Sequence, residues 1–240
     1  MTIANLQTSA SVEVETDTLG GSRLLDSGIY NLTIKTAYLG MTRNEGYSFN
    51  IEAETPEGVP VRQTMYVTSG KAKGVKNTYT KNGKDFYLPD FITANAICEL
   101  SLDKSIGDLQ TEVKVIKMYD FESKKEMPTE VNMYVDLIGA VFSAGVLKKV
   151  TDKNEKNGEG AYVATGETRE SNVIDKIFRA SDGLTKSEIV SGVTNATFFP
   201  KWKEKWDGKV QNQAKGVRDA SLGGGGTAGA PGAPKKSLFN

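Results

Sequence analysis

The sequence contains no histidine and a single cysteine, Cys98, among its 240 residues. Without histidine, the chain lacks the commonest general base, every Ser-His or Cys-His nucleophile pair and the usual zinc ligand. One cysteine cannot form an internal disulfide, which fits a reducing compartment. These absences argue against common hydrolytic enzymes, and we expect a non-enzymatic protein without a metal or another cofactor.

Long hydrophobic runs are also missing. No apolar stretch approaches the roughly 18 residues that a membrane-spanning helix requires. Residues 1–21 do not contain a basic segment followed by an apolar one, so we expect no signal peptide and no membrane partner.

The chain has no excess of charge of either sign, because 30 lysines and arginines balance 30 aspartates and glutamates. The local distribution is uneven, however. Residues 61–91 and residues 201–218 each carry six cationic side chains against two acidic ones. Local basic segments matter more for binding a polyanion than the total charge does.

The order of hydrophobic and turn residues predicts a mainly β chain. Three short runs with β-favouring residues and tight turns between them predict an antiparallel meander over residues 28–38, 47–53 and 61–67. A glycine-rich basic loop follows over residues 69–87, with a small hairpin turning at Asn82-Gly83. Apolar spacing then predicts a helix over residues 91–102.

Later segments are less regular. Strand-like runs cover residues 112–119 and 131–149, and the polar residues 152–160 predict an exposed loop. Residues 171–179 fit either a strand or a helix. Thr185 and Glu188 have the spacing of a capping box, which predicts the start of a short helix.

These elements suggest a domain with appendages. We expect a polar, disordered arm over residues 1–26, a domain over residues 27–218 and a disordered Gly/Ala/Pro-rich tail over residues 219–240. Five or so short strands with a helix inserted late in the series indicate an OB-fold-like small antiparallel barrel, which carries the basic hairpin loop. A generic β-sandwich remains the alternative.

The basic loop combines the two groups that bind single-stranded nucleic acid. Its lysines can neutralise phosphates, and Tyr79, Phe86 and Tyr87 can stack on bases. Arg62 and Tyr66 share one face of the preceding strand and join the candidates. The alternative interpretation is a solvated hairpin whose aromatic side chains fold back onto the core.

The second basic segment contains Trp202 and Trp206, which are four residues apart and share a helix face. Paired apolar residues at this spacing favour packing against the barrel. In the alternative interpretation Trp202 contacts DNA, and the surrounding lysines extend a track for phosphates.

Several segments carry a likeness to a known family. They are Gly20-Gly21, Ser27-Gly28-Ile29-Tyr30, the junction from Arg62 to Gly70, Phe86-Tyr87-Leu88-Pro89, Gly166–Asn172 with Asp175–Phe178, Phe199–Lys205 and the tail from Gly223 to Asn240. In these segments the chain resembles single-stranded-DNA-binding proteins of tailed, podovirus-like bacteriophages.

The resemblance implies an OB-fold protein that coats single-stranded DNA during phage replication or recombination in the host cytoplasm. It implies a binding groove along Arg62, Lys71, Lys73, Lys76, Tyr79, Lys81 and Lys84. It also implies that Leu238 and Phe239 at the tail contact phage replication proteins. Lys235 and Lys236 stand where such tails carry acids, so the charge mimicry of DNA is missing.

Two other function classes remain as alternatives. A phage structural or assembly protein would have no affinity for nucleic acid. A nuclease with a carboxylate-bound metal is less well supported, because the acidic residues between 103 and 126 are scattered among lysines. The sequence leaves the number of subunits open.

Overall fold

The computed structural model describes residues 24–120, 123–158 and 161–215. The chain forms two compact units. Of the described residues, the first unit combines those up to Lys148 with Asn172–Val210, and the second combines those within Lys149–Ser171 with residues 211–215. Among the described residues, no helix is long and apolar enough to cross a membrane.

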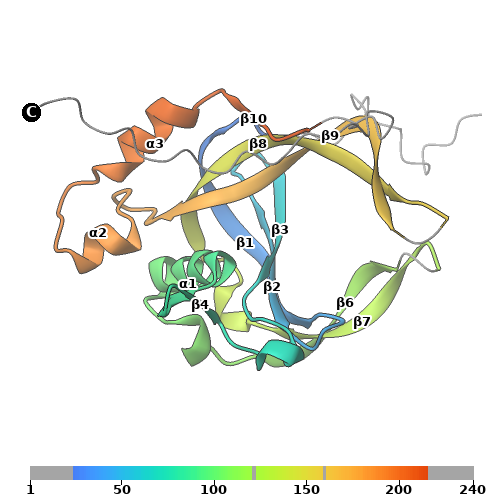
Figure 1. The fold of residues 1–240 in the computed structure, drawn as a ribbon. Helices are drawn as coiled ribbons and strands as arrows, with labels where there is room; N and C mark the ends of the chain where they lie inside the picture. The colour runs from blue at the N-terminus through green and yellow to red at the C-terminus, as the bar shows by residue number, and fades with distance from the viewer. Residues whose placement is uncertain (1–23, 121–122, 159–160, 216–240) are drawn as a thin grey trace, which may run out of the picture. The chain divides into compact units, whose positions relative to one another are not determined.

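The first unit is built on the expected antiparallel meander. Strands β1 (Gly28–Met41), β2 (Tyr47–Glu54) and β3 (Pro60–Tyr66) lie side by side in Figure 1 and pair in that order. The start of β1 also pairs with β8 (Val141–Lys156), which in turn pairs with β9 (Tyr162–Phe178). The backbone N–H of Ile174 in β9 donates to the side chain of Gln63 in β3 at 2.7 Å. The antiparallel sheet is therefore curled, which is compatible with an OB-like fold.

Alternation along β2 and β3 separates a buried face from a polar one. Phe49, Ile51, Val61 and Met65 are at most 3% exposed. Helix α1 (Pro89–Leu102), which confirms the helix expected there, supplies Ala94, Ile97 and Cys98 to the same core. Burial raises the pKa of the Cys98 thiol to about 12, so this group is a packing residue without thiolate character.

The late helices also follow the sequence patterns. Helix α2 (Lys186–Val190) begins with the expected capping box, in which Thr185 and Glu188 bond each other's backbone N–H groups. Helix α3 (Phe198–Trp206) follows, and a short strand β10 (Val210–Asn212) pairs with β8.

Three expectations are corrected. The run expected over 131–149 is divided into β7 (Lys125–Met133) and β8 by a 3-10 turn at Val135–Leu137. The loop expected over 152–160 is largely strand, because β8 continues to Lys156 and β9 begins at Tyr162. As a result, the strands outnumber the five or so expected.

The polar ribbon of the second unit explains the missed strands. This ribbon buries neither face, so its residues show no hydrophobic alternation. It is held instead by polar pairs across the ribbon, such as Lys153 with Glu167 at 2.8 Å. Backbone contacts with the following segment add to these, including Gln213 N–H to Val150 O at 2.8 Å.

The residues before β1 are bonded to β9. Leu25, expected in the arm, donates its N–H to Asn172 and accepts a bond from the same side chain, both at 2.8 Å. The rest of the expected arm and tail, including Leu238 and Phe239, lies outside the described residues.

Candidate nucleic-acid interface

The basic loop is held against the turn between β1 and β2. Ser69 N–H donates to Lys76 O at 2.8 Å, and Lys76 N–H donates to the Ser69 hydroxyl at 3.0 Å. Gly70 lies so close to Asn44 that a Cβ at Gly70 would stand 2.9 Å from the Asn44 Cβ and carbonyl oxygen. Only glycine allows this approach, so the loop has a defined backbone at its base.

The hairpin in the loop forms at the expected turn. Strands β4 (Thr78–Lys81) and β5 (Lys84–Tyr87) are joined by Asn82 and Gly83, whose φ angles are 51° and 72°. Positive φ at both central residues is the requirement of a type I′ turn. The Asn-Gly prediction is therefore confirmed.

The aromatic side chains of the hairpin remain accessible. Tyr79 and Phe86 are opposite each other across the ladder, with ring centroids 5.8 Å apart, and are 42% and 45% exposed. Tyr87 is 55% exposed and stacks on Phe91 of α1 at 5.1 Å. Tyr87 therefore packs on α1, and all three rings keep an exposed surface.

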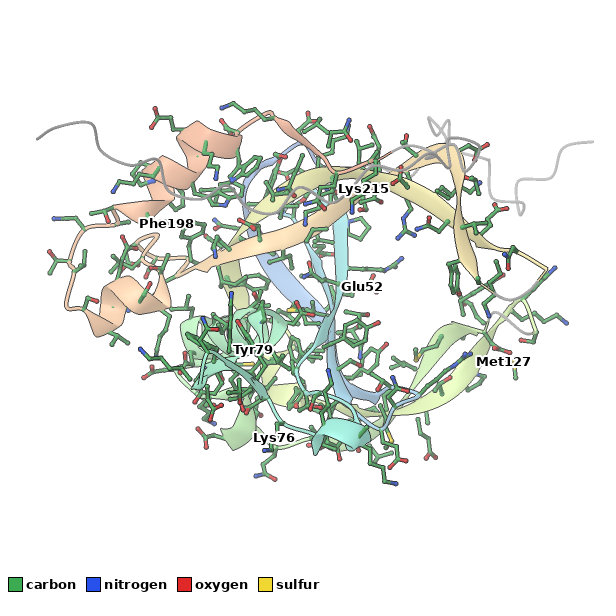
Figure 2. The ribbon with its side chains drawn as sticks, in the orientation of Figure 1. Glu52, Lys76, Tyr79, Met127, Phe198 and Lys215 are labelled. Carbon is green, nitrogen blue, oxygen red and sulfur yellow. The ribbon has the colours of Figure 1, made fainter. Side chains whose placement is uncertain are left out.

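The cations of this region fall into two groups. Arg62 pairs with Glu52 and Lys71 with Glu45, each at 2.8 Å. The hydrogen bond and charge of Glu52 raise the pKa of Arg62. Within the described parts of the chain, the remaining lysines have no carboxylate within 4.0 Å; these are Lys73, Lys76, Lys81 and Lys84. Lys76 and Tyr79 are labelled in Figure 2.

A groove of about 990 Å³ joins the loop to the sheet and to α1. Tyr66, Ser69, Lys71, Lys73 and Asp90 are among its lining residues. The Asp90 carboxylate accepts a bond from the backbone N–H of Tyr66 at 2.8 Å, which fixes the start of α1 to the end of β3. Tyr66, at the end of β3, is 58% exposed and lines this groove.

The sheet presents a polar face next to this groove. We call it the polar sheet face, and its residues come from β1, β2 and β3: Thr36, Tyr38, Asn50, Glu52, Arg62 and Thr64. Its side chains are connected, since the Thr64 hydroxyl donates to Asn50 at 2.8 Å. Burial and the charge of Glu52 raise the pKa of Tyr38, so this phenol stays protonated and can donate a hydrogen bond.

Sequence reasoning placed Arg62, Thr64 and Tyr66 on this side of the sheet, and chose only Arg62 and Tyr66 as site residues. It missed Tyr38, Asn50 and Thr64 as site residues. The signal that could have found Asn50 is the alternation in β2, where polar residues separate the buried Phe49, Ile51 and Ala53. Tyr38 has no such local signal, because it depends on the pairing of β1 with β2.

The second basic segment places its tryptophan differently. Trp202 is 3% exposed, and its Nε1–H donates to the Asp175 carboxylate at 2.7 Å. A Cβ at Gly145 would stand 2.7 Å from the Trp202 ring, so the indole packs directly on the β8 backbone. Packing was the favoured interpretation and is confirmed, and a ring buried in this way has little surface to offer a base.

The described residues hold no group of three or more side chains suited to bind a metal ion. The comparisons add no family assignment: no protein-family model matches the chain, and no curated protein matches it in sequence. The loop, the groove and the polar sheet face are therefore the features that indicate what this site can bind.

Proposed function

We propose that this protein binds single-stranded DNA without enzymatic activity and largely without regard to sequence. The observation that carries the proposal is the loop over residues 69–87. It combines four lysines that lack an acidic partner among the described residues with three half-exposed aromatic rings.

The two groups have complementary roles. Unpaired lysines attract phosphates and release counterions, which gives affinity for any sequence. Exposed rings stack on bases, whose faces are free only in a single strand. The adjoining groove and the polar sheet face offer a path of hydrogen-bonding groups to a strand that leaves the loop.

The proposal includes the biological setting that the resemblance implies. The protein would coat single-stranded DNA in phage replication or recombination, in the host cytoplasm. Leu238 and Phe239 of the tail would contact phage replication proteins.

Fluorescence anisotropy tests the binding directly. Labelled oligo-dT and a duplex of the same length are titrated at about 50 and about 300 mM salt, where phosphate contacts give a steep dependence. We expect tight, salt-sensitive binding that favours the single strand. Binding that favours the duplex would contradict the proposal.

A charge-matched pair of variants locates the interface. Replacing Lys73, Lys76, Lys81 and Lys84 by alanine should lower the salt slope by up to about 3, since each phosphate contact in a single strand contributes about 0.7. The control removes the same charge from the other basic segment, at Lys201, Lys203, Lys205 and Lys209. An equal loss in both variants would mean that the loop has no special role.

The alternative function, a phage structural or assembly protein, makes the opposite prediction. It requires no affinity for either oligonucleotide at low salt and a defined large oligomer in light scattering.

A further inference from the structure

A two-stranded ribbon extends from the sheet beside Tyr38. It consists of β6 (Glu112–Asp120) and β7 (Lys125–Met133), and it joins the sheet where Tyr38 pairs with Met133. Nearly all of its residues are exposed or half-exposed. A two-stranded ribbon by itself is only marginally stable in water. The exposure of both faces of this ribbon therefore suggests a role other than packing.

One face of the ribbon borders the polar sheet face. Ile116, Lys117 and Met118 line a groove of about 330 Å³ together with Tyr38, Asn50, Arg62 and the rest of that face. Met118 pairs with Met127, and Ile116 with Thr129, so these four side chains lie on the same side of the ribbon. Met127 is 46% exposed and is labelled in Figure 2.

The two faces of the ribbon differ in chemistry. The side with Ile116 and Met118 also carries Met127 and Met133, and it has charged residues at both ends of the ribbon. The other side carries Val113, Val115 and Tyr119, opposite residues of β7 that include two glutamates. Methionine is flexible and polarisable, and its thioether packs well on aromatic faces of any shape. Met118 in the groove, with Met127 beside it across the ladder, therefore suits flat ligands that vary in outline.

We propose that the ribbon is the second wall of the single-stranded-DNA site. Unpaired bases lie in the groove between Met118 and the polar sheet face, with Met127 next to Met118 across the ladder, while the phosphates lie along the basic loop. This inference rests on the proposed function. It adds that the groove recognises the exposed faces of nucleobases. Bases in a duplex are covered by stacking and do not enter.

The experiment compares two oligonucleotides of equal charge. One is oligo-dT, and the other has the same phosphates but abasic sugars throughout. The test variant is Met118→Ala with Met127→Ala, and the control is Val113→Ala with Val115→Ala on the opposite face of the same ribbon. Valines 113 and 115 are 65% and 62% exposed, so the control keeps the fold. Circular dichroism melts check that both variants stay folded.

We expect the wild type to prefer oligo-dT over the abasic strand. The methionine variant should lose about threefold to tenfold in affinity for oligo-dT and little for the abasic strand. The valine control should keep the full preference. An unchanged preference in the methionine variant, with wild-type binding intact, would overturn the role of the ribbon alone. Failure of the wild type to bind oligo-dT would instead overturn the proposed function and this inference together.

Discussion

Two segments of the chain combine lysines with aromatic residues, and they differ in how far their aromatic side chains are buried. The loop over residues 69–87 leaves Tyr79 and Phe86 almost half exposed. The segment that includes α3 buries Trp202 in a cluster with Leu147 and Phe178, and keeps its lysines outside.

The difference shows that the spacing of the aromatic residues, and not the composition of the segment, decides which rings stay exposed. A separation of four residues puts Trp202 and Trp206 on one helix face, which packs on the sheet. In the hairpin, Tyr79 and Phe86 are neighbours across two strands that have no buried residue. Rings on such a hairpin gain little from packing and remain available.

The largest effect should come from Trp202→Ala. Removing a buried indole costs about 3–5 kcal/mol of the free energy of unfolding, and it leaves Asp175 without its donor. Urea denaturation measures the loss. Trp202→Phe, which keeps a ring but not the N–H, should cost less. The comparison would break if Trp202→Ala weakened DNA binding while leaving stability unchanged.

The double variant Tyr79→Ala with Phe86→Ala should lose affinity for DNA and keep its stability. Each stacked base is worth about 1–3 kcal/mol of binding free energy, whereas the half-exposed rings should contribute little to stability. Anisotropy with oligo-dT gives the affinity, and a urea titration gives the stability. A matched control is Tyr119→Ala, because this ring is 53% exposed on the outer side of the β6–β7 ribbon. A loss of stability without loss of affinity would assign the hairpin rings to the core.

Much of the first unit could be predicted from local sequence. The alternation in β2 and β3, the Asn82-Gly83 turn and the Thr185–Glu188 capping box each act over a few residues, and the structure confirms them. The packing of Trp202 could also be predicted, since helical spacing carries that signal.

The remaining features depend on pairing between distant segments. The polar sheet face exists because Tyr38 pairs with Asn50, and the ribbon groove exists because β7 meets β1 at Tyr38. No local pattern in the sequence specifies these contacts. The ribbon of the second unit was missed for a different reason, because two exposed faces give a strand no hydrophobic period.

Glu188 tests how the segment that buries Trp202 is held together. Burial tends to raise the pKa of this carboxyl, but bonds from Thr185, Thr197 and the N–H of Phe198 lower it to about 2. These bonds join the start of α2 to the start of α3. Glu188→Gln should therefore cost about 1–2 kcal/mol of stability at neutral pH, as expected for a lost cap.

The sign of the pH dependence follows from the lowered pKa. The contribution of Glu188 is complete above its unfolded value near 4.5 and is lost as the pH falls towards about 2. The stability difference between wild type and Glu188→Gln should shrink over that interval in acid denaturation. Glu204→Gln, on the exposed side of α3, is the control for the loss of one carboxylate from this segment. A difference that stayed constant with pH would remove Glu188 from this role.

The smallest effect concerns a single ion pair in the loop. Glu45 neutralises Lys71 at 2.8 Å, in a pair whose side chains are 55% and 71% exposed. Glu45→Gln should release this lysine and steepen the salt dependence of oligo-dT binding by up to about 0.7, while stability changes by less than about 1 kcal/mol. The control is Glu54→Gln, which frees Lys35 at the other end of β2. If both variants steepened the dependence equally, the gain would come from net charge, and the loop would lose its distinction from the rest of the surface.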